Sequence, residues 1–264
     1  MIVDLTYPIS EGMFKYPSDD ELEMRIKKAK LERVEKTLYE ETGQGSGAGY
    51  VEEKYISGHI VLKMRNHHGT HIDAPSHKIQ GGKNIDEYGI QKFVNNSCIL
   101  VDLTSVDLLK RKDREISVDD IEGVFDSEKH CGLESLIFYT GFCDELKKMD
   151  GKLKGDAKKD FEKGFPHFSF EAAMHVVEKN PDLEIIGIDS FSVDRSGSNS
   201  EVHRIFFKRD ILPLESVVNL GELKNRLNKS DKNTFRLFSV PLNYRGSDAA
   251  QVRAYAFLDD YERV

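Results

Sequence analysis

Short apolar runs separated by polar, serine-led stretches recur through the middle of the chain. Continuous apolar character predicts buried strands at 98–103, 135–140 and 184–189. Between these runs, Ser117, which has an acid three residues later, and Ser169 are suited to begin helices. Strands that alternate with helices in this way pack as layers, so the pattern favours an α/β fold.

Weaker patterns mark the remaining elements. A short strand is predicted at 2–5, a short helix at 85–93, and a closing pair of strands at 237–242 and 252–258. Between 146 and 163 the chain is almost all Lys, Asp and Gly around a few apolar residues, which predicts a surface loop or a frayed helix.

The segment from about 19 to 54 breaks this pattern. It is dense in Glu and Lys and contains the glycine-rich run 43–49, so we interpret it as a solvated hairpin or helix that ends in a flexible loop. The glycine run lacks the lysine and the helix start of a phosphate-binding loop, which favours a plain linker. With 264 residues, the chain is long enough for one core, and a single domain over 1–264 with this charged insertion is expected.

Charge and composition narrow the classes of partner. The formal net charge is −8, and an acidic chain is poorly suited to general nucleic-acid binding. No apolar window is long enough to span a bilayer and Asp4 interrupts the first apolar residues, so neither membrane association nor a signal peptide is expected, and a cytoplasmic location is predicted. Cys98, Cys131 and Cys143 form no Cys-x-x-Cys pair, so neither a disulfide framework nor a thiolate metal site is indicated.

The densest chemistry lies at 66–77, where four histidines and one carboxylate fall within twelve residues. Neutral imidazole and carboxylate are the usual ligands of zinc and similar divalent ions. Gly69 and Pro75 argue against a helix in this stretch. We therefore predict a turn that enters a short extended segment.

Alternation along that extended segment places His71 and Asp73 on the same side, and the glycine in the turn lets the backbone bring His67 alongside. These three side chains are the candidate metal ligands. His77, beyond the proline, is suited to proton transfer near neutral pH as a general base or acid. His68 points away from the others on any regular backbone and is assigned a structural or surface role.

Polar residues further along the chain are less specific. Ser200 begins a predicted helix that carries His203, and Glu215 follows an apolar run. The local pattern is equally typical of a surface histidine and a solvated carboxylate. Asp189, at the end of the predicted strand 184–189, is suited either to orienting a metal-bound histidine or to capping the next turn.

The order His67-x-Gly-Thr-His71-x-Asp73-Ala-Pro-x-His77 resembles the signature of the cyclase family, whose best-known members are bacterial kynurenine formamidases, with isatin hydrolases as relatives. The signature is long, mixed in residue type and ungapped. Further likenesses follow in the family's order at 4–9, 187–194, 203–204, 214–215 and 241–242.

This resemblance implies a cyclase-like swivelling β/β/α domain, usually a homodimer or larger assembly, with a centre for two divalent ions. Five residues match the family's metal ligands: His67, His71, Asp73, His203 and Glu215. Asp73 and Glu215 match the bridging carboxylates, and His77 matches the proton-transfer histidine. Nitrogen and oxygen ligands without thiolate suit zinc, with manganese as the alternative.

The resemblance also implies hydrolysis of a C–N amide bond by a metal-activated water, with a small-molecule aryl formamide such as N-formylkynurenine as substrate. Two alternatives stay open: hydrolysis of a cyclic amide such as isatin, and a metal- or ligand-binding member without catalysis. The kynurenine-specific members carry a tryptophan in the N-terminal loop, whereas this chain has no Trp and Tyr16 takes that place, where its ring can stack on an aryl group of the substrate.

Overall fold

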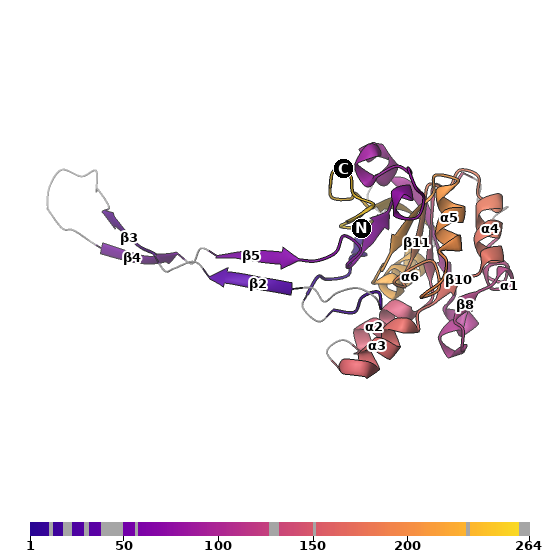
Figure 1. Cartoon of the computed structure of the whole chain (residues 1–264), viewed down its shortest axis with the longest axis horizontal. Coiled ribbons are helices and arrows are strands. Elements are labelled where there is room, and N and C mark those ends of the chain that lie inside the picture. Colours follow the sequence, from indigo (N-terminus) through magenta and orange to yellow (C-terminus); the bar gives the residue numbers. More distant parts are fainter. Residues whose placement is uncertain are drawn as a thin grey trace.

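A nine-stranded mixed sheet forms the centre of the molecule (Figure 1). The computed structural model describes residues 1–10, 13–17, 23–28, 32–37, 50–55, 58–126, 132–149, 152–230 and 233–258. In sheet order the strands are β1 (Ile2–Asp4), β15 (Tyr255–Phe257), β13 (Thr234–Phe238), β7 (Asn96–Asp102), β9 (Ser135–Tyr139), β11 (Ile185–Ile188), β12 (Leu212–Glu215), β6 (His71–Asp73) and β14 (Ala249–Gln251).

The three continuous apolar runs are the centre of this sheet, as predicted. They form β7, β9 and β11, which pair in parallel, and β12 continues the parallel set on the far side of β11. The remaining neighbours pair antiparallel, including β13 with β15. The predicted closing pair 237–242 and 252–258 is correct only in part, because β13 ends at Phe238 and β14 comes before β15 in the chain. The expectation of an α/β fold is therefore confirmed.

Helices lie on both faces of the sheet (Figure 1). One face carries α1 (Val118–Glu122), α4 (Phe170–Lys179) and α5 (Glu201–Phe207), and the other carries α2 (Phe142–Met149) and α6 (Leu220–Ser230), with α3 (Gly155–Lys163) beside α2. Alternate residues of β9 divide the core, because Leu136 and Phe138 pack in the first layer and Ile137 and Tyr139 in the second.

Both predicted serine caps are present. The Ser117 side chain accepts from the Asp120 backbone N–H, and the Asp120 carboxylate accepts in return from Ser117, which completes a capping box. The Ser169 hydroxyl accepts from the Ala172 N–H at the start of α4. Helix α1 is one short helix of five residues and ends at Glu122.

The structure decides two expectations about local structure. The charged region 146–163 holds the end of α2 and all of α3, so the helical alternative is correct and the surface loop is wrong. Phe142 and Leu146 lie four residues apart on α2 and pack in the core, and Phe161 of α3 packs against it. The stretch 85–93 forms two separate 3-10 turns, η2 (Ile85–Glu87) and η3 (Ile90–Phe93), in place of one helix.

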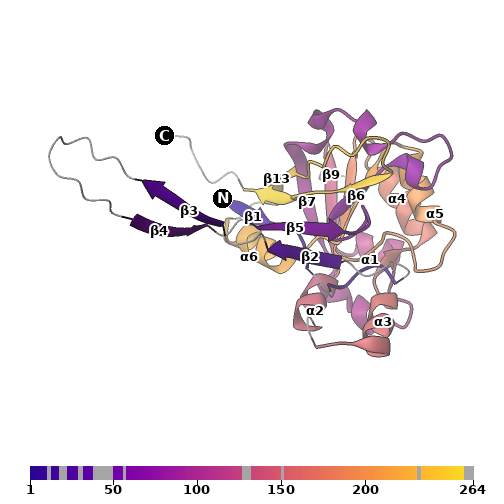
Figure 2. The same ribbon diagram turned by 60° about the vertical axis from the view of Figure 1, so that its left-hand side comes forward.

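The insertion is a β ribbon, so the hairpin interpretation is correct and the helical alternative is wrong. Strand β2 (Glu23–Lys28) pairs antiparallel with β5 (Gly58–Lys63), and β3 (Glu32–Thr37) pairs antiparallel with β4 (Tyr50–Tyr55). Figures 1 and 2 show this ribbon projecting away from the sheet and its helices. The glycine run 43–49 lies outside the described residues.

Short elements complete the connections. They are the parallel pair β8 (Glu115–Ile116) and β10 (His167–Phe168) and the 3-10 turns η1 (Pro75–His77), η4 (Thr104–Val106) and η5 (Leu108–Lys110). Among the described residues, no helix combines the length and the apolar character needed to cross a bilayer.

Candidate metal centre

The pairing of β6 with β12 places three candidate ligands on one side of the sheet. His71 lies directly opposite Glu215 in the antiparallel register, so both side chains leave the same face. Asp73 is two residues further along β6 and shares that face, while Ile72 points into the core on the other. The predicted extended segment after the turn is thus confirmed.

The turn before β6 is held by Thr70. Its hydroxyl accepts from the Tyr7 N–H at 2.7 Å and donates to the Ser216 carbonyl at 2.7 Å, which ties the turn to the N-terminal segment and to the end of β12. Gly69 has φ +72°, a backbone conformation that residues with a Cβ rarely adopt. With the backbone bent in this way, His67 Nδ1 lies 2.9 Å from Asp73 Oδ1.

Helix α5 brings the third histidine from the other side. His203 Nε2 lies 3.0 Å from Asp73 Oδ2 and 3.3 Å from Glu215 Oε1. Asp194 fixes this helix start, because its carboxylate accepts from the backbone N–H groups of Val202 and His203. Residues more than a hundred positions apart in the sequence therefore converge on one point.

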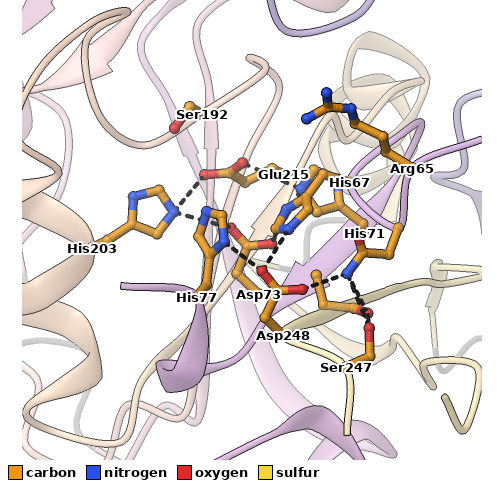
Figure 3. A network of polar contacts seen from close by, with 12 residues as sticks. Arg65, His67, His71, Asp73, His77, Ser192, His203, Glu215, Ser247 and Asp248 are labelled. Carbon is orange, nitrogen blue, oxygen red and sulfur yellow. Dashed lines mark hydrogen bonds and ion pairs between the residues drawn. The ribbon is translucent and has the colours of Figure 1, made fainter. Parts of the chain in front are cut away.

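Each of the two carboxylates faces histidines on both sides (Figure 3). Asp73 directs Oδ1 to His67 and His71 and directs Oδ2 to His203. Glu215 directs Oε2 to His71 at 3.4 Å and Oε1 to His203 at 3.3 Å. Asp73 and Glu215 therefore each lie between His71 and His203.

The rings of the three histidines are also oriented by hydrogen bonds to groups that surround the cluster. His71 Nδ1 donates to the Gly69 carbonyl at 2.9 Å, His203 Nδ1 to Asp194 at 2.5 Å, and His67 Nε2 to Asp248 at 3.2 Å. With the outer nitrogen donating, the inner nitrogen of each neutral ring carries its lone pair toward the shared carboxylates.

Two buried atoms test whether a divalent ion fits here. His71 Nε2 and Asp73 Oδ1 have no hydrogen-bond partner among the described residues, although they lie on side chains that are 2% and 1% exposed. Ligand atoms of His67, His71 and Asp73, and likewise of Asp73, His77 and His203, lie within 4.8 Å of one another. Imidazole nitrogens and carboxylate oxygens are ligands that zinc and manganese accept, so the donor set fits a divalent cation.

The electrostatics of the cluster also call for positive charge. Burial lowers the pKa of His67 and His71, but the Asp73 carboxylate outweighs it and raises these pKa values to about 9 and about 10. Burial raises the pKa of Asp73, yet the charges of His67 and His71 hold it well below its usual range. The two buried carboxylates need either protons on the histidines or a metal ion.

His77 lies at the edge of the cluster, at the end of η1. Its Nε2 is 4.0 Å from Asp73 Oδ2, and its Nδ1 donates to Asp248 Oδ2 at 2.8 Å. Hydrogen bonds from His67 and His77 lower the pKa of Asp248 far below its usual range, so this carboxylate is ionised. His77 thus presents Nε2 to the cluster with Nδ1 held.

Sequence reasoning missed Asp248 and Asp194. Asp248 lies in the turn before β14, where an aspartate is common for local reasons, and only the contacts of its two oxygens with His67, His77 and Asn66 distinguish it. Asp194 lay within a stretch that was noted for its polar residues, but the orienting role was considered for Asp189.

Asp189 serves neither of the two roles that were considered for it, because it neither contacts a histidine of the cluster nor caps the turn that follows it. Its carboxylate accepts from the Thr140 hydroxyl and backbone N–H and from the Cys143 N–H, and so it caps the start of α2 from the neighbouring strand. Burial raises the pKa of Asp189 to about 6.

A cavity of about 490 Å³ opens over the cluster. Tyr16 lines it, accepts from the Gly197 N–H through its hydroxyl at 3.4 Å, and lies 5.9 Å from the Phe165 ring. Phe191 lines the same cavity and packs edge-on against Phe165. His68 is buried and does not line this cavity.

Residues 3–195 match the family model described as "Putative cyclase", which is well over half of the chain. The chain belongs to the cyclase family. Cyclase-like protein 1 of Arabidopsis thaliana is 27% identical over 197 residues, 73% of this chain. The chain spans less than two thirds of that plant protein and of Cyclase-like protein 3, at 66% and 62% of their lengths.

Two further cyclase-family relatives match nearly the whole chain. A kynurenine formamidase of Bacillus cereus is 25% identical over 253 residues, which cover 96% of this chain and 95% of that protein. The solved structure of isatin hydrolase A from Labrenzia aggregata superposes with a TM-score of 0.64 at 18% identity and covers 97% of this chain and 93% of that one. The expected cyclase-like α/β fold is therefore confirmed.

Proposed function

We propose that this cyclase-family chain is a metal-dependent hydrolase that cleaves the C–N bond of an aryl formamide. The observation that carries the proposal is the pair of buried carboxylates, Asp73 and Glu215, each shared between two groups of histidines at the base of a cavity. The match to a kynurenine formamidase over 96% of the chain supports this reaction class.

Five side chains hold the ions in this proposal. His67, His71 and Asp73 take the first, and His203 and Glu215 take the second, with both carboxylates shared. When bound, a pair of divalent ions lowers the pKa of water and stabilises the negative charge that develops on the carbonyl oxygen. Zinc suits the donor set best, and manganese is the alternative.

His77 moves the proton in this proposal. Because its Nδ1–H donates to the ionised Asp248, the Nε2 atom is the one that faces the reacting groups. That nitrogen accepts a proton from the attacking water and delivers it to the departing nitrogen, which cannot leave as an anion. Asp248 keeps the ring in the tautomer and orientation that this transfer needs.

Tyr16 and Phe191 orient the substrate. Both line the cavity and both contact Phe165, so they form one aromatic wall beside the cluster. An aryl ring stacked there holds its formamide carbon over the shared carboxylates, which fixes the direction of attack.

Parallel assays test the proposal. Metal-loaded protein is given formanilides, the cyclic amide isatin, and a panel of lactams and esters, and kcat/KM is compared across them. We expect the open formamides to be preferred. A preference for isatin would replace this substrate class with a cyclic amide, and no hydrolysis of any member of the panel would leave a metal- or ligand-binding protein without catalysis.

The homodimer or larger assembly, the single domain over 1–264 and the cytoplasmic location stay predictions. Light scattering of the purified full-length chain tests the first of these directly.

A further inference from the structure

The cavity has a feature that the metal chemistry does not use. Besides the histidines and carboxylates, three basic side chains line it: Arg65, Lys78 and Arg195. Three basic residues therefore line one cavity in a chain whose net charge is −8.

Two of these cations form no ion pair within the described part of the chain. Among the described residues, no carboxylate oxygen lies within 4.0 Å of the charged nitrogens of Lys78 or Arg195. The acids that line the cavity are engaged by histidines, as Asp73 is by His203 and Asp248 is by His77. Lys78 and Arg195 therefore do not neutralise the carboxylates of the cavity through direct ion pairs.

Both cations lie next in sequence to residues of the cluster. Lys78 follows His77, and Arg195 follows Asp194, which accepts from His203. The rings of His77 and His203 lie 5.6 Å apart, so both basic residues reach the cavity from positions next to the residues of the cluster.

The aromatic wall is tied to the segment that carries Arg195. The backbone N–H of Gly197, two residues beyond Arg195, donates to the hydroxyl of Tyr16. Tyr16, Lys78 and Arg195 line the same cavity, so an aryl ring stacked on Tyr16 and an anionic group on that ring would share this space with both cations.

We propose that Lys78 and Arg195 form a subsite for a carboxylate on the aryl part of the substrate, so that the preferred substrates are acidic aryl amides. This rests on the proposed hydrolase function. The guanidinium offers paired donors to the two carboxylate oxygens, and the ammonium adds a point charge. The two cations also offset the repulsion that the acidic floor exerts on an anion entering the cavity.

Two compounds of the same shape test the subsite. One is acidic, meta-formamidobenzoate, and the other is neutral, meta-formamidobenzamide. In wild type, kcat/KM should favour the acid. In the double variant Lys78→Gln/Arg195→Gln, the ratio of acid to amide should fall by about tenfold or more, the value of charge-assisted hydrogen bonds of this kind. Arg195→Glu should lower the ratio further.

A matched control is Lys83→Gln/Arg209→Gln, which removes the same two charge types from residues that do not line the cavity. This control should keep the wild-type ratio. An unchanged ratio in the Lys78 and Arg195 variant would overturn the subsite while leaving the hydrolase proposal intact.

Binding measured without turnover separates the two proposals. Calorimetry with meta-acetamidobenzoate and its carboxamide, on metal-loaded protein, reports the subsite even if no amide is hydrolysed. A preference for the acid that the double variant loses supports the subsite. Equal affinity for both compounds in wild type rejects it, whatever the assays of hydrolysis give.

Discussion

The floor and the rim of the cavity use the same residue types in different settings. On the floor, His71, Asp73, His203 and Glu215 are at most 3% exposed and come from β6, β12 and α5. On the rim, the side chains are 18% exposed for His67, 20% for His77 and 38% for Asp248. Floor residues are fixed by paired strands and a helix, whereas rim residues sit on turns in reach of water.

This difference separates two tasks. Ligands of an ion need a fixed geometry and a site from which bulk water is excluded, which the floor supplies. A proton-transfer group must exchange its proton with water, which the rim permits. His67 connects the two regions, because it contacts Asp73 with one nitrogen and Asp248 with the other.

The largest effect is expected on the floor. His71→Ala removes the proposed metal-ligand nitrogen that lies beside both Asp73 and Glu215. Hydrolysis should therefore fall by more than about 10,000-fold, beyond what a general acid alone contributes. Metal content should fall with it, as measured by elemental analysis. His175→Ala, a histidine of α4 remote from the cavity, is the matched control and should retain both ions and activity.

On the rim, His77→Gln should lower kcat by about 100- to 1,000-fold and leave the metal content unchanged, because only the proton transfer is lost. An ester with a good leaving group needs no such proton and should lose less activity. An equal loss on amide and ester, or a loss of metal, would contradict the assignment of His77 to proton transfer.

Asp248→Asn should have a smaller effect, about 10- to 100-fold in kcat at saturating metal, because it loosens His67 and His77 without removing either. The double variant with His77→Gln should lose much less kcat than the product of the two single losses, because the share of the Asp248 effect that runs through the His77 ring is already gone and only the share through His67 is left. Losses that multiply would show that Asp248 acts independently of His77. Asp182→Asn, on an exposed turn, is the control.

The last effect is on stability. In metal-free protein, burial lowers the pKa of His67 and His71 but Asp73 raises it more, from the ordinary 6.5 to about 9 and about 10. The protonated forms of His67 and His71 therefore stabilise the folded state. This contribution to the free energy of unfolding, on the order of a few kcal/mol, is fully present below pH 6.5 and is lost as the pH rises toward 10. Melting temperatures in chelator from pH 6 to pH 10 should therefore decline. The metal-loaded protein should decline less, and equal slopes would indicate that no ion replaces these protons.

Local patterns were sufficient to predict much of the fold. The apolar runs of β7, β9 and β11 and the serine caps of α1 and α4 are visible over a few residues. Local alternation also predicted that His71 and Asp73 share a face. In contrast, the region of α2 and α3 was left open between a loop and a helix because charged residues surround the few apolar positions that these helices bury.

The rest of the site could not be predicted from the residues alone. His203 and Glu215 reach Asp73 only because β12 pairs with β6 and α5 packs above them, contacts that join distant parts of the chain. The resemblance to a family, not the local pattern, selected these two residues. Asp248 had no such signal, since a turn aspartate looks the same with or without a histidine beside it.

Ion content and hydrolysis measured on the same preparation test the central claim most directly. The account predicts about two divalent ions per chain in active protein, loss of formanilide hydrolysis when a chelator removes them, and recovery as zinc or manganese is restored. Full hydrolysis by protein that elemental analysis shows to be free of metal would contradict it.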